Sequence, residues 1–337
     1  MSNMGQQEGM RRAVGLFGGG LDSLLAFHSM ESAGVSVEGV HFDTGFVRDA
    51  HRDQAHAASE RGGVTVIDVR QRYLEEVVAR PRSGYGAGMN PCHDCRAFML
   101  ARADEFAARR GIDLLFTGDV IGQRSHDQSH EAFRIADRES GVAGRVLRPL
   151  SASHLDPVVH PAAVHEDEPA TRLQGRSRRE QLRLAAQWNV REFPTPSGRC
   201  CRLADPAFAR RVRDYLEHCR PGELRAADIP ILGIGRHFRL GWDLKVILSR
   251  NEAEARRLDT LGSRLGRCAP ADLPGPQGWI VGGSADDGAD ADIAALLARY
   301  TPQAAPDGLD VRLVRGGRER IVRARPVDAE TVALWRI

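Results

Sequence analysis

A short apolar strand, Val14–Phe17, runs directly into three consecutive glycines and then into a helical pattern, and this order constrains the fold more than any other feature of the chain. Glycine has no Cβ, so its backbone N–H groups approach an anion closely. The helix that follows points the positive end of its dipole at the same place. Such a loop holds phosphate groups, with a carboxylate available for a metal ion and a hydroxyl for a hydrogen bond. The residues predicted to bind in this way are Gly18, Gly19, Gly20, Asp22 and Ser23.

The spacing of the glycines excludes the two commonest nucleotide-binding loops. The Walker loop needs G-x-x-x-x-G-K-[ST], and no lysine follows these glycines. The dinucleotide pattern G-x-G-x-x-G fails as well, because Ser23 stands three positions after Gly20. A glycine-rich turn that only joins a strand to a helix is the remaining alternative. The order of strand, loop and helix favours phosphate binding.

Strand and helix patterns alternate through the first half of the chain. This βαβα order is typical of an α/β fold with a parallel, doubly wound sheet. Ligands of such sheets bind at the carboxyl ends of the strands. Residues 17–20, 43–45 and 117–123 all follow strands, so we expect them to converge on one crevice. The predicted strands are 13–17, 35–42, 64–69 and 113–117, and the predicted helices are 21–33, 49–62 and 98–110.

The length and net charge of the chain limit how many domains it can form and what surfaces it can present. At 337 residues it is long enough for two domains. We expect a disordered polar tail at 1–12, the α/β domain at 13–221 and a smaller α+β domain at 222–337. There is no run of about 18 apolar residues, so we expect a cytoplasmic protein without a membrane span. The net charge is only +2, so any nucleic-acid surface must be a local patch.

One stretch offers such a patch. Arginine recurs through a predicted helical segment, and exposed arginine at this density can contact an RNA backbone. A solvated helix face, balanced by Glu180, explains the same pattern. The arginines are Arg172, Arg176, Arg178, Arg179 and Arg183.

Four of the six cysteines occur in two groups. Cys92 and Cys95 form a C-x-x-C just before the predicted helix 98–110, where backbone donors and a proline turn favour the thiolate. Cys200 and Cys201 are adjacent in a much later loop. The two remaining cysteines, Cys219 and Cys268, are interpreted as packing residues.

The grouped cysteines fit several chemistries. Zinc would use four ligands, although adjacent cysteines seldom both bind one tetrahedral ion. Three cysteines around a [4Fe-4S] cluster would leave one iron open for a substrate. In persulfide chemistry one cysteine carries sulfur and another resolves it. A structural zinc loop or unreactive thiols explain the pattern too.

The glycine-rich loop also resembles a known family. The string G-G-G-L-D-S at 18–23 is similar to the S-G-G-x-D-S pyrophosphatase loop (PP-loop) of the ATP-pyrophosphatase superfamily, with Gly18 where serine is usual. With N-P-C-H-D-C at 90–95 and a later loop cysteine, the chain resembles the tRNA thiouridine synthases. It is most similar to stand-alone ThiI/MnmA-like sulfurtransferases that lack the THUMP RNA-binding domain.

Further segments extend this resemblance. The later family cysteine lies in P-A-G-G-C-L-L-T-D-P, and here 196–206 reads P-S-G-R-C-C-R-L-A-D-P. Counting back from the final D-P selects Cys201, which we prefer, and counting forward from Pro196 selects Cys200. Other similar segments are H-F-D-T-G-F at 41–46, T-G-D-V-I-G-Q-R at 117–124, R-P-L-S-A at 148–152 and G-R-S-R at 175–178. G-R-H-F-R-L at 235–240 and S-R-N-E at 249–252 resemble an NFACT-R type C-terminal domain.

The resemblance implies an enzyme that adenylates a uridine carbonyl oxygen with ATP and replaces it with sulfur. It implies Mg²⁺ at Asp22 and a [4Fe-4S] cluster on three cysteines, with zinc or a persulfide as alternatives. The implied catalytic residues are Asp22, Cys92, Cys95 and Cys201, and the possible metal ligands are Cys92, Cys95, Cys200 and Cys201. The implied nucleotide-binding residues are Gly18, Gly19, Gly20, Asp22, Ser23, His41, Phe42, Asp43, Thr44, Gly118, Asp119 and Gln123.

The implied partners are tRNA and a sulfur donor, either sulfide or a cysteine desulfurase, and a homodimer is possible. Two other functions remain open. The same fold could thiolate a small molecule, or the chain could be a non-catalytic protein that binds RNA or a nucleotide.

Overall fold

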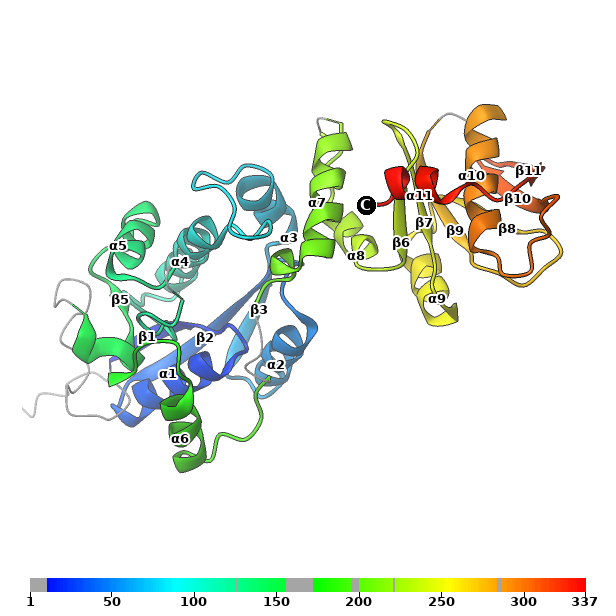
Figure 1. The fold of residues 1–337 in the computed structure, drawn as a ribbon. Coiled ribbons are helices and arrows are strands. Elements are labelled where there is room, and N and C mark those ends of the chain that lie inside the picture. Colours follow the sequence, from blue (N-terminus) through cyan, green and yellow to red (C-terminus); the bar gives the residue numbers. More distant parts are fainter. Residues whose placement is uncertain (1–10, 125–126, 156–171, 195–199, 221, 284–286) are drawn as a thin grey trace, which may run out of the picture. The chain divides into compact units, whose positions relative to one another are not determined.

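The computed structural model describes residues 11–124, 127–155, 172–194, 200–220, 222–283 and 287–337. Most of the tail expected at 1–12 therefore lies outside the described residues, as do residues 195–199 before the second cysteine pair. The chain divides into two compact units, 1–204 and 205–337 (Figure 1). No helix among the described residues combines the length and apolar character needed to cross a bilayer.

The first unit is built on a five-stranded parallel sheet of order β3-β2-β1-β4-β5. Helices α1, α2 and α6 lie on one face, and α4 and α5 on the other (Figure 1). The α/β prediction is confirmed. The strands are β1 (Arg12–Leu16), β2 (Ser36–Asp43), β3 (Val64–Asp68), β4 (Leu114–Thr117) and β5 (Val146–Leu147). The helices are α1 (Leu21–Ser32), α2 (Asp49–Glu60), α3 (Arg70–Tyr73), α4 (Cys92–Ala108), α5 (His130–Glu139) and α6 (Arg179–Gln187).

Apolar residues on the sheet and on α1 explain why these elements pack. Leu25 and Met30 of α1 are fully buried against Phe116 of β4. Burying a side chain of this size stabilises the fold by about 1.5–3 kcal/mol relative to leaving it exposed. In a parallel sheet of this order the strand order reverses between β1 and β4, and ligands bind at that point, outside the carboxyl ends of the strands.

One helix begins earlier than the sequence pattern indicated. The helix predicted at 98–110 is α4, which begins at Cys92 directly after Pro91. Proline suits this position because its missing N–H is not needed at a helix start. The C-x-x-C, expected just before the helix, therefore occupies its first turn.

The second unit carries a six-stranded antiparallel sheet of order β11-β10-β8-β9-β7-β6. Its core joins Val246 and Ile280 of the sheet to Ile293 and Leu297 of α10. The strands are β6 (Arg236–Arg239), β7 (Leu244–Leu248), β8 (Gly266–Pro270), β9 (Gly278–Gly282), β10 (Leu309–Arg315) and β11 (Arg318–Ala324). The helices are α7 (Pro206–His218), α8 (Ile229–Leu232), α9 (Glu252–Leu261), α10 (Asp287–Tyr300) and α11 (Ala329–Trp335).

The boundary expected between residues 221 and 222 lies inside this second unit, because side chains of the sheet hold α7. The Asp214 carboxylate accepts hydrogen bonds from Arg239 at 2.8 Å and from Lys245 at 2.7 Å. Lys245, the single lysine of the sequence, is buried at this contact. The ion pairs bind the helix to β6 and β7.

Candidate functional site

A cavity of ≈ 310 Å³ opens at the carboxyl ends of β1, β2 and β4, where the sheet order predicts a ligand. The loop after β1, the segment after β4 and both cysteine pairs line it together. The structure therefore brings together groups that lie more than a hundred residues apart in sequence. The predicted site residues that line the cavity are Gly18, Gly20, Asp22, Ser23, His41, Phe42, Thr44, Cys92, Cys95, Gly118, Asp119, Gln123, Cys200 and Cys201.

Two predicted residues do not line this cavity. Gly19 has a φ of +70° and lies against the backbone of His51, which a Cβ would meet at 2.1 Å. Asp43 accepts a hydrogen bond from the Gly45 N–H at 2.9 Å, and its other oxygen lies 4.0 Å from Arg70. Both residues shape the loops that reach the cavity.

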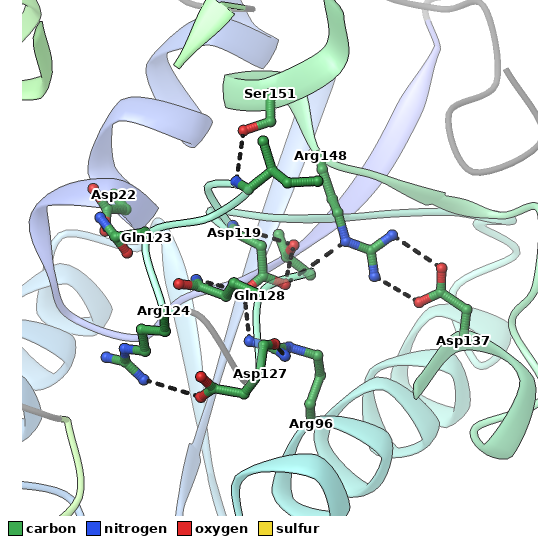
Figure 2. A network of polar contacts seen from close by, with 12 residues as sticks. Asp22, Arg96, Asp119, Gln123, Arg124, Asp127, Gln128, Asp137, Arg148 and Ser151 are labelled. Atoms are coloured by element: carbon green, nitrogen blue, oxygen red, sulfur yellow. Dashed lines mark hydrogen bonds and ion pairs between the residues drawn. The ribbon is translucent and has the colours of Figure 1, made fainter. Parts of the chain in front are cut away.

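Asp22 presents an open acceptor to the cavity. Its Oδ2 accepts a hydrogen bond from Gln123 Nε2 at 2.9 Å, whereas its Oδ1 is buried without a hydrogen-bond partner (Figure 2). Burial raises the pKa of this carboxyl, and the Gln123 hydrogen bond opposes the rise. A buried carboxylate oxygen of this kind suits a hard cation such as Mg²⁺, which takes oxygen ligands.

Ser23 and His41 lie on either side of the loop. The Ser23 hydroxyl donates to the Gly20 carbonyl at 2.7 Å, so in this geometry its proton is turned back into the loop. His41 Nδ1 lies 2.8 Å from the Phe17 carbonyl, and its Nε2 is buried without a partner. Burial lowers the pKa of His41. A neutral ring that donates from Nδ1 leaves Nε2 as an acceptor in the wall of the cavity.

Asp119, predicted to contact the nucleotide, has its carboxylate occupied by the protein. Its oxygens accept from Arg96 at 3.0 Å and Thr117 at 2.9 Å, and the Arg148 guanidinium lies 3.8 Å away (Figure 2). Burial raises the pKa of Asp119, but these positive neighbours outweigh it and the pKa is lowered. Asp119 therefore stays charged and fixes the segment after β4.

The two cysteine pairs face the cavity from different elements. Cys92 and Cys95 occupy the first turn of α4, and Asn90 Nδ2 donates to Cys92 Sγ at 3.2 Å. The later pair is held by the segment after β2. Val47 and Cys201 form an antiparallel bridge, and the Arg48 N–H donates to the Cys200 carbonyl at 3.0 Å.

The expectation that the C-x-x-C favours a thiolate is wrong for the protein without a bound metal. Burial raises the pKa of Cys92, and it raises that of Cys95 to about 12. The pKa of Cys201 is also raised well above its usual value, first by burial and then by its thiol neighbours. The loss of solvation raises the thiol pKa more than the backbone N–H donors at the start of the helix lower it. Cys268 is buried in the second unit, as expected of a packing residue.

The cavity is also lined by residues that sequence reasoning did not assign to it, among them His51, Arg124 and Arg178. His51 lies in α2, where no sequence pattern indicates a site, and its Nδ1 is buried without a partner. Arg124 lies 3.7 Å from Asp127 (Figure 2). Arg178, which was grouped with a possible RNA-binding patch, lines the cavity instead. Two signals were available for Arg178, because it ends the G-R-S-R segment and stands directly before α6.

Two family models match this chain. Residues 9–164 match the family described as thiamine biosynthesis protein (ThiI), and residues 235–336 match the NFACT protein RNA binding domain. The curated tRNA-specific 2-thiouridylase MnmA of Xanthobacter autotrophicus (strain ATCC BAA-1158 / Py2) is 27% identical over 258 residues. That alignment covers 68% of this chain and 62% of the relative, so the chain spans less than two thirds of the length of that protein.

A solved structure of the C-terminal part of the fibronectin/fibrinogen-binding protein from Streptococcus suis aligns with 38% of this chain and 69% of that chain. Its TM-score is 0.27 and its sequence identity 14%. The glycine-rich loop, the sheet order and the match over residues 9–164 agree: the first unit is similar to the PP-loop proteins of the ThiI type. Residues 235–336 are similar to the NFACT RNA-binding domain.

Proposed function

We propose that this chain is an ATP-dependent sulfurtransferase that adenylates a uridine carbonyl oxygen of tRNA and replaces that oxygen with sulfur. One observation carries the proposal: the glycine-rich loop and all four grouped cysteines line the same cavity. An activating site and a sulfur-handling site must share such a space, because the activated base has to meet the sulfur before water does. The ThiI and MnmA resemblances support the same chemistry.

The first step makes a poor leaving group into a good one. The uridine carbonyl oxygen attacks the α-phosphate of ATP, and pyrophosphate leaves. Gly20 and the first turn of α1 offer backbone N–H groups to the departing pyrophosphate. Asp22, through its unpartnered Oδ1, would hold a Mg²⁺ that neutralises it. We assign adenosine contacts to the segment after β2, from His41 to Thr44, and to Gly118.

The second step adds sulfur at the activated carbon. Hydrosulfide attacks that carbon, AMP departs with the former carbonyl oxygen, and the proton of the hydrosulfide is released. The products are the thiocarbonyl, AMP and one proton. Attack by water at the activated carbon would instead regenerate uridine.

We propose that the cysteines hold a [4Fe-4S] cluster rather than a single metal ion. Among the described residues, no three His, Cys, Asp or Glu side chains are grouped closely enough to hold one ion. Sulfurs that bind different irons of a cluster stand farther apart than those that share one zinc. We propose Cys92, Cys95 and Cys201 as ligands, with Cys200 as the alternative third. Such a cluster supplies an iron with an open position for hydrosulfide.

Burial of the thiols bears on the persulfide alternative. A free thiol that carries or resolves a persulfide must ionise, and burial opposes that at Cys95 and Cys201. Coordination to a metal deprotonates a thiol outright. The same burial that suppresses a free thiolate therefore suits metal ligands.

Anaerobic reconstitution with iron and sulfide tests the cluster. We expect Cys92→Ala, Cys95→Ala and Cys201→Ala to lose most of the iron–sulfur absorbance, and Cys219→Ala, outside the cavity, to retain it. Iron counts and electron paramagnetic resonance spectra measure the effect. If Cys201→Ala retained the iron–sulfur absorbance and Cys200→Ala lost it, Cys200 would be the third ligand in place of Cys201. A metal-free wild type that thiolates tRNA would contradict the cluster.

A second prediction concerns the close approach of Gly118 to the backbone of Asp22, behind the glycine-rich loop. A Cβ at Gly118 would meet the Asp22 carbonyl oxygen at 2.6 Å, whereas one at Gly18 would meet nothing within 4 Å. We expect Gly118→Ala to displace the start of α1 and to weaken ATP binding about tenfold or more. Gly18→Ala and Gly18→Ser should bind ATP within about threefold of wild type. Isothermal titration of each variant with ATP and Mg²⁺ measures this, and equal affinities for Gly118→Ala and Gly18→Ala would contradict it.

The substrate is tested by pyrophosphate release with and without tRNA. We expect unmodified tRNA to stimulate release, and mass spectrometry of digested tRNA to show a thiolated uridine when sulfide is supplied. Release without tRNA but with a small acceptor would favour the small-molecule sulfurtransferase. ATP binding without turnover under any condition would favour a non-catalytic protein.

A further inference from the structure

A cationic cavity and an exposed tryptophan lie at the same end of the antiparallel sheet in the second unit. The β6–β7 turn, the end of β9 and the β10–β11 turn all lie there, because Leu244 pairs with Gly282 and Arg315 reaches the Gly282 carbonyl at 3.1 Å. We call this surface the sheet rim. It is defined by Trp242, Arg315, Arg318 and Arg320, with Asp290 beneath them.

The cavity of the rim is ≈ 120 Å³ and is lined mainly by arginine. Asp290, almost fully buried in α10, accepts from Arg315 Nη1 at 3.0 Å and from Arg320 Nη1 at 2.9 Å. Arg315 Nη2 also donates to the Gly283 carbonyl at 2.8 Å. Both oxygens of the buried carboxylate are thus occupied, and the guanidinium groups around the cavity are fixed in place.

Arg318 supplies the remaining charge. It lines the same cavity and is exposed, and its side chain has no ion-pair or hydrogen-bond partner within the described part of the chain. Three guanidinium groups thus surround a cavity that contains one carboxylate, so the cavity carries excess positive charge. Arginine binds phosphate through parallel N–H donors, and fixed donors lose little freedom on binding. The ligand that this chemistry fits is a phosphate group.

Trp242 supplies an aromatic surface at the same end of the sheet. Its side chain is 74% exposed, although tryptophan is usually buried. The Arg239 guanidinium donates to the Trp242 carbonyl at 3.2 Å while it is held by Asp214, and the His218 ring lies 4.6 Å from the indole. The turn is therefore anchored from two sides. An exposed indole on a fixed turn is suited to stacking against an unpaired base.

The two features lie within reach of one nucleic-acid strand. Strands β7 and β10 are separated by β8 and β9 in the sheet, which places them roughly 14 Å apart. We propose that the sheet rim binds unpaired nucleotides of the RNA substrate, with Trp242 stacking on a base and the Arg315–Arg318–Arg320 cavity taking a backbone phosphate. The inference rests on the proposed function for the identity of the RNA. It goes beyond the family match by naming the residues that make the contact.

Fluorescence anisotropy of the full chain with labelled, unmodified tRNA tests the rim. Trp242→Ala should weaken binding about tenfold, and Trp242→Phe, which keeps a ring, should stay within about threefold of wild type. Arg318→Ala should reduce the slope of log affinity against log salt by about one. Arg325→Ala is the matched control, because Arg325 is exposed just beyond the other end of β11. Thermal melting of each variant confirms that the fold is retained.

The outcomes separate this inference from the proposed function. The proposal that the sheet rim binds RNA would be contradicted by equal affinities for wild type and Trp242→Ala, or by equal salt slopes for Arg318→Ala and Arg325→Ala. Either result would count against it even if the enzyme thiolates tRNA. Loss of binding in Trp242→Ala but not in Trp242→Phe would support the rim even if no thiolated uridine is found. A wild type that binds no RNA would overturn both.

Discussion

Asp22→Asn is expected to reduce the rate of pyrophosphate release by about 10³-fold without destabilising the protein. The Asp22 Oδ1 is buried and unpartnered, so the variant removes the charge on which we place Mg²⁺. Burial raises the pKa of this carboxyl, which means that the folded protein disfavours its charged form. A neutral amide of the same shape removes that cost and can keep the Gln123 contact. The melting temperature should therefore be no lower than that of wild type.

Pyrophosphate release with saturating ATP, Mg²⁺ and tRNA measures the rate, and differential scanning fluorimetry measures the melting temperature. Glu31→Gln is the control, since Glu31 is an exposed acid near the other end of α1. Its rate should match wild type. If Asp22→Asn kept a tenth of the wild-type rate, Asp22 would not be a ligand of the metal ion.

Arg148→Met is expected to lower the free energy of unfolding by about 3–5 kcal/mol. Arg148 is completely buried and donates to both oxygens of Asp137, at 2.9 Å and 2.6 Å (Figure 2). Its guanidinium also faces Asp119 and lies over the Phe133 ring at 4.3 Å. Removing it leaves Asp137 buried without its counter-charge. For a unit of this size the melting temperature should fall by about 10 °C.

Two variants distinguish loss of the buried pair from a general effect of removing an arginine. Arg148→Met combined with Asp137→Leu should recover most of the stability, because both buried charges are gone and Asp119 keeps Arg96. Arg183→Met, which removes an exposed pair with Glu180, should cost no more than about 1 kcal/mol. Equal melting temperatures for Arg148→Met and Arg183→Met would show that the buried network does not stabilise the unit.

Local patterns were enough to predict the parallel sheet and most of the cavity. The strand, loop and helix around Asp22 follow one another directly, and the segments after β2 and β4 each adjoin their strand. In a parallel sheet such segments meet at one edge by geometry alone. Asp22 and Gln123 could therefore be placed near one another without knowledge of any contact, whereas the cysteines were assigned to the same site only from the family resemblance.

The sequence could not show how each group is solvated or paired. The expected thiolate at Cys95 fails because the helix start is buried, and burial depends on residues far away along the chain. Asp119 follows a strand like any ligand-binding carboxylate, and only the structure shows that Arg96 and Arg148 occupy it. His51 reaches the cavity from α2, where no local pattern indicates a site.

The buried thiols of the cavity should resist oxidation. Oxidants attack thiolates, so cysteines whose pKa is raised by burial oxidise slowly at neutral pH. Cys95 and Cys201 are protected in this way, whereas Cys200 is exposed to solvent. For the cluster that we propose, oxidation of the metal-free protein would therefore begin at Cys200.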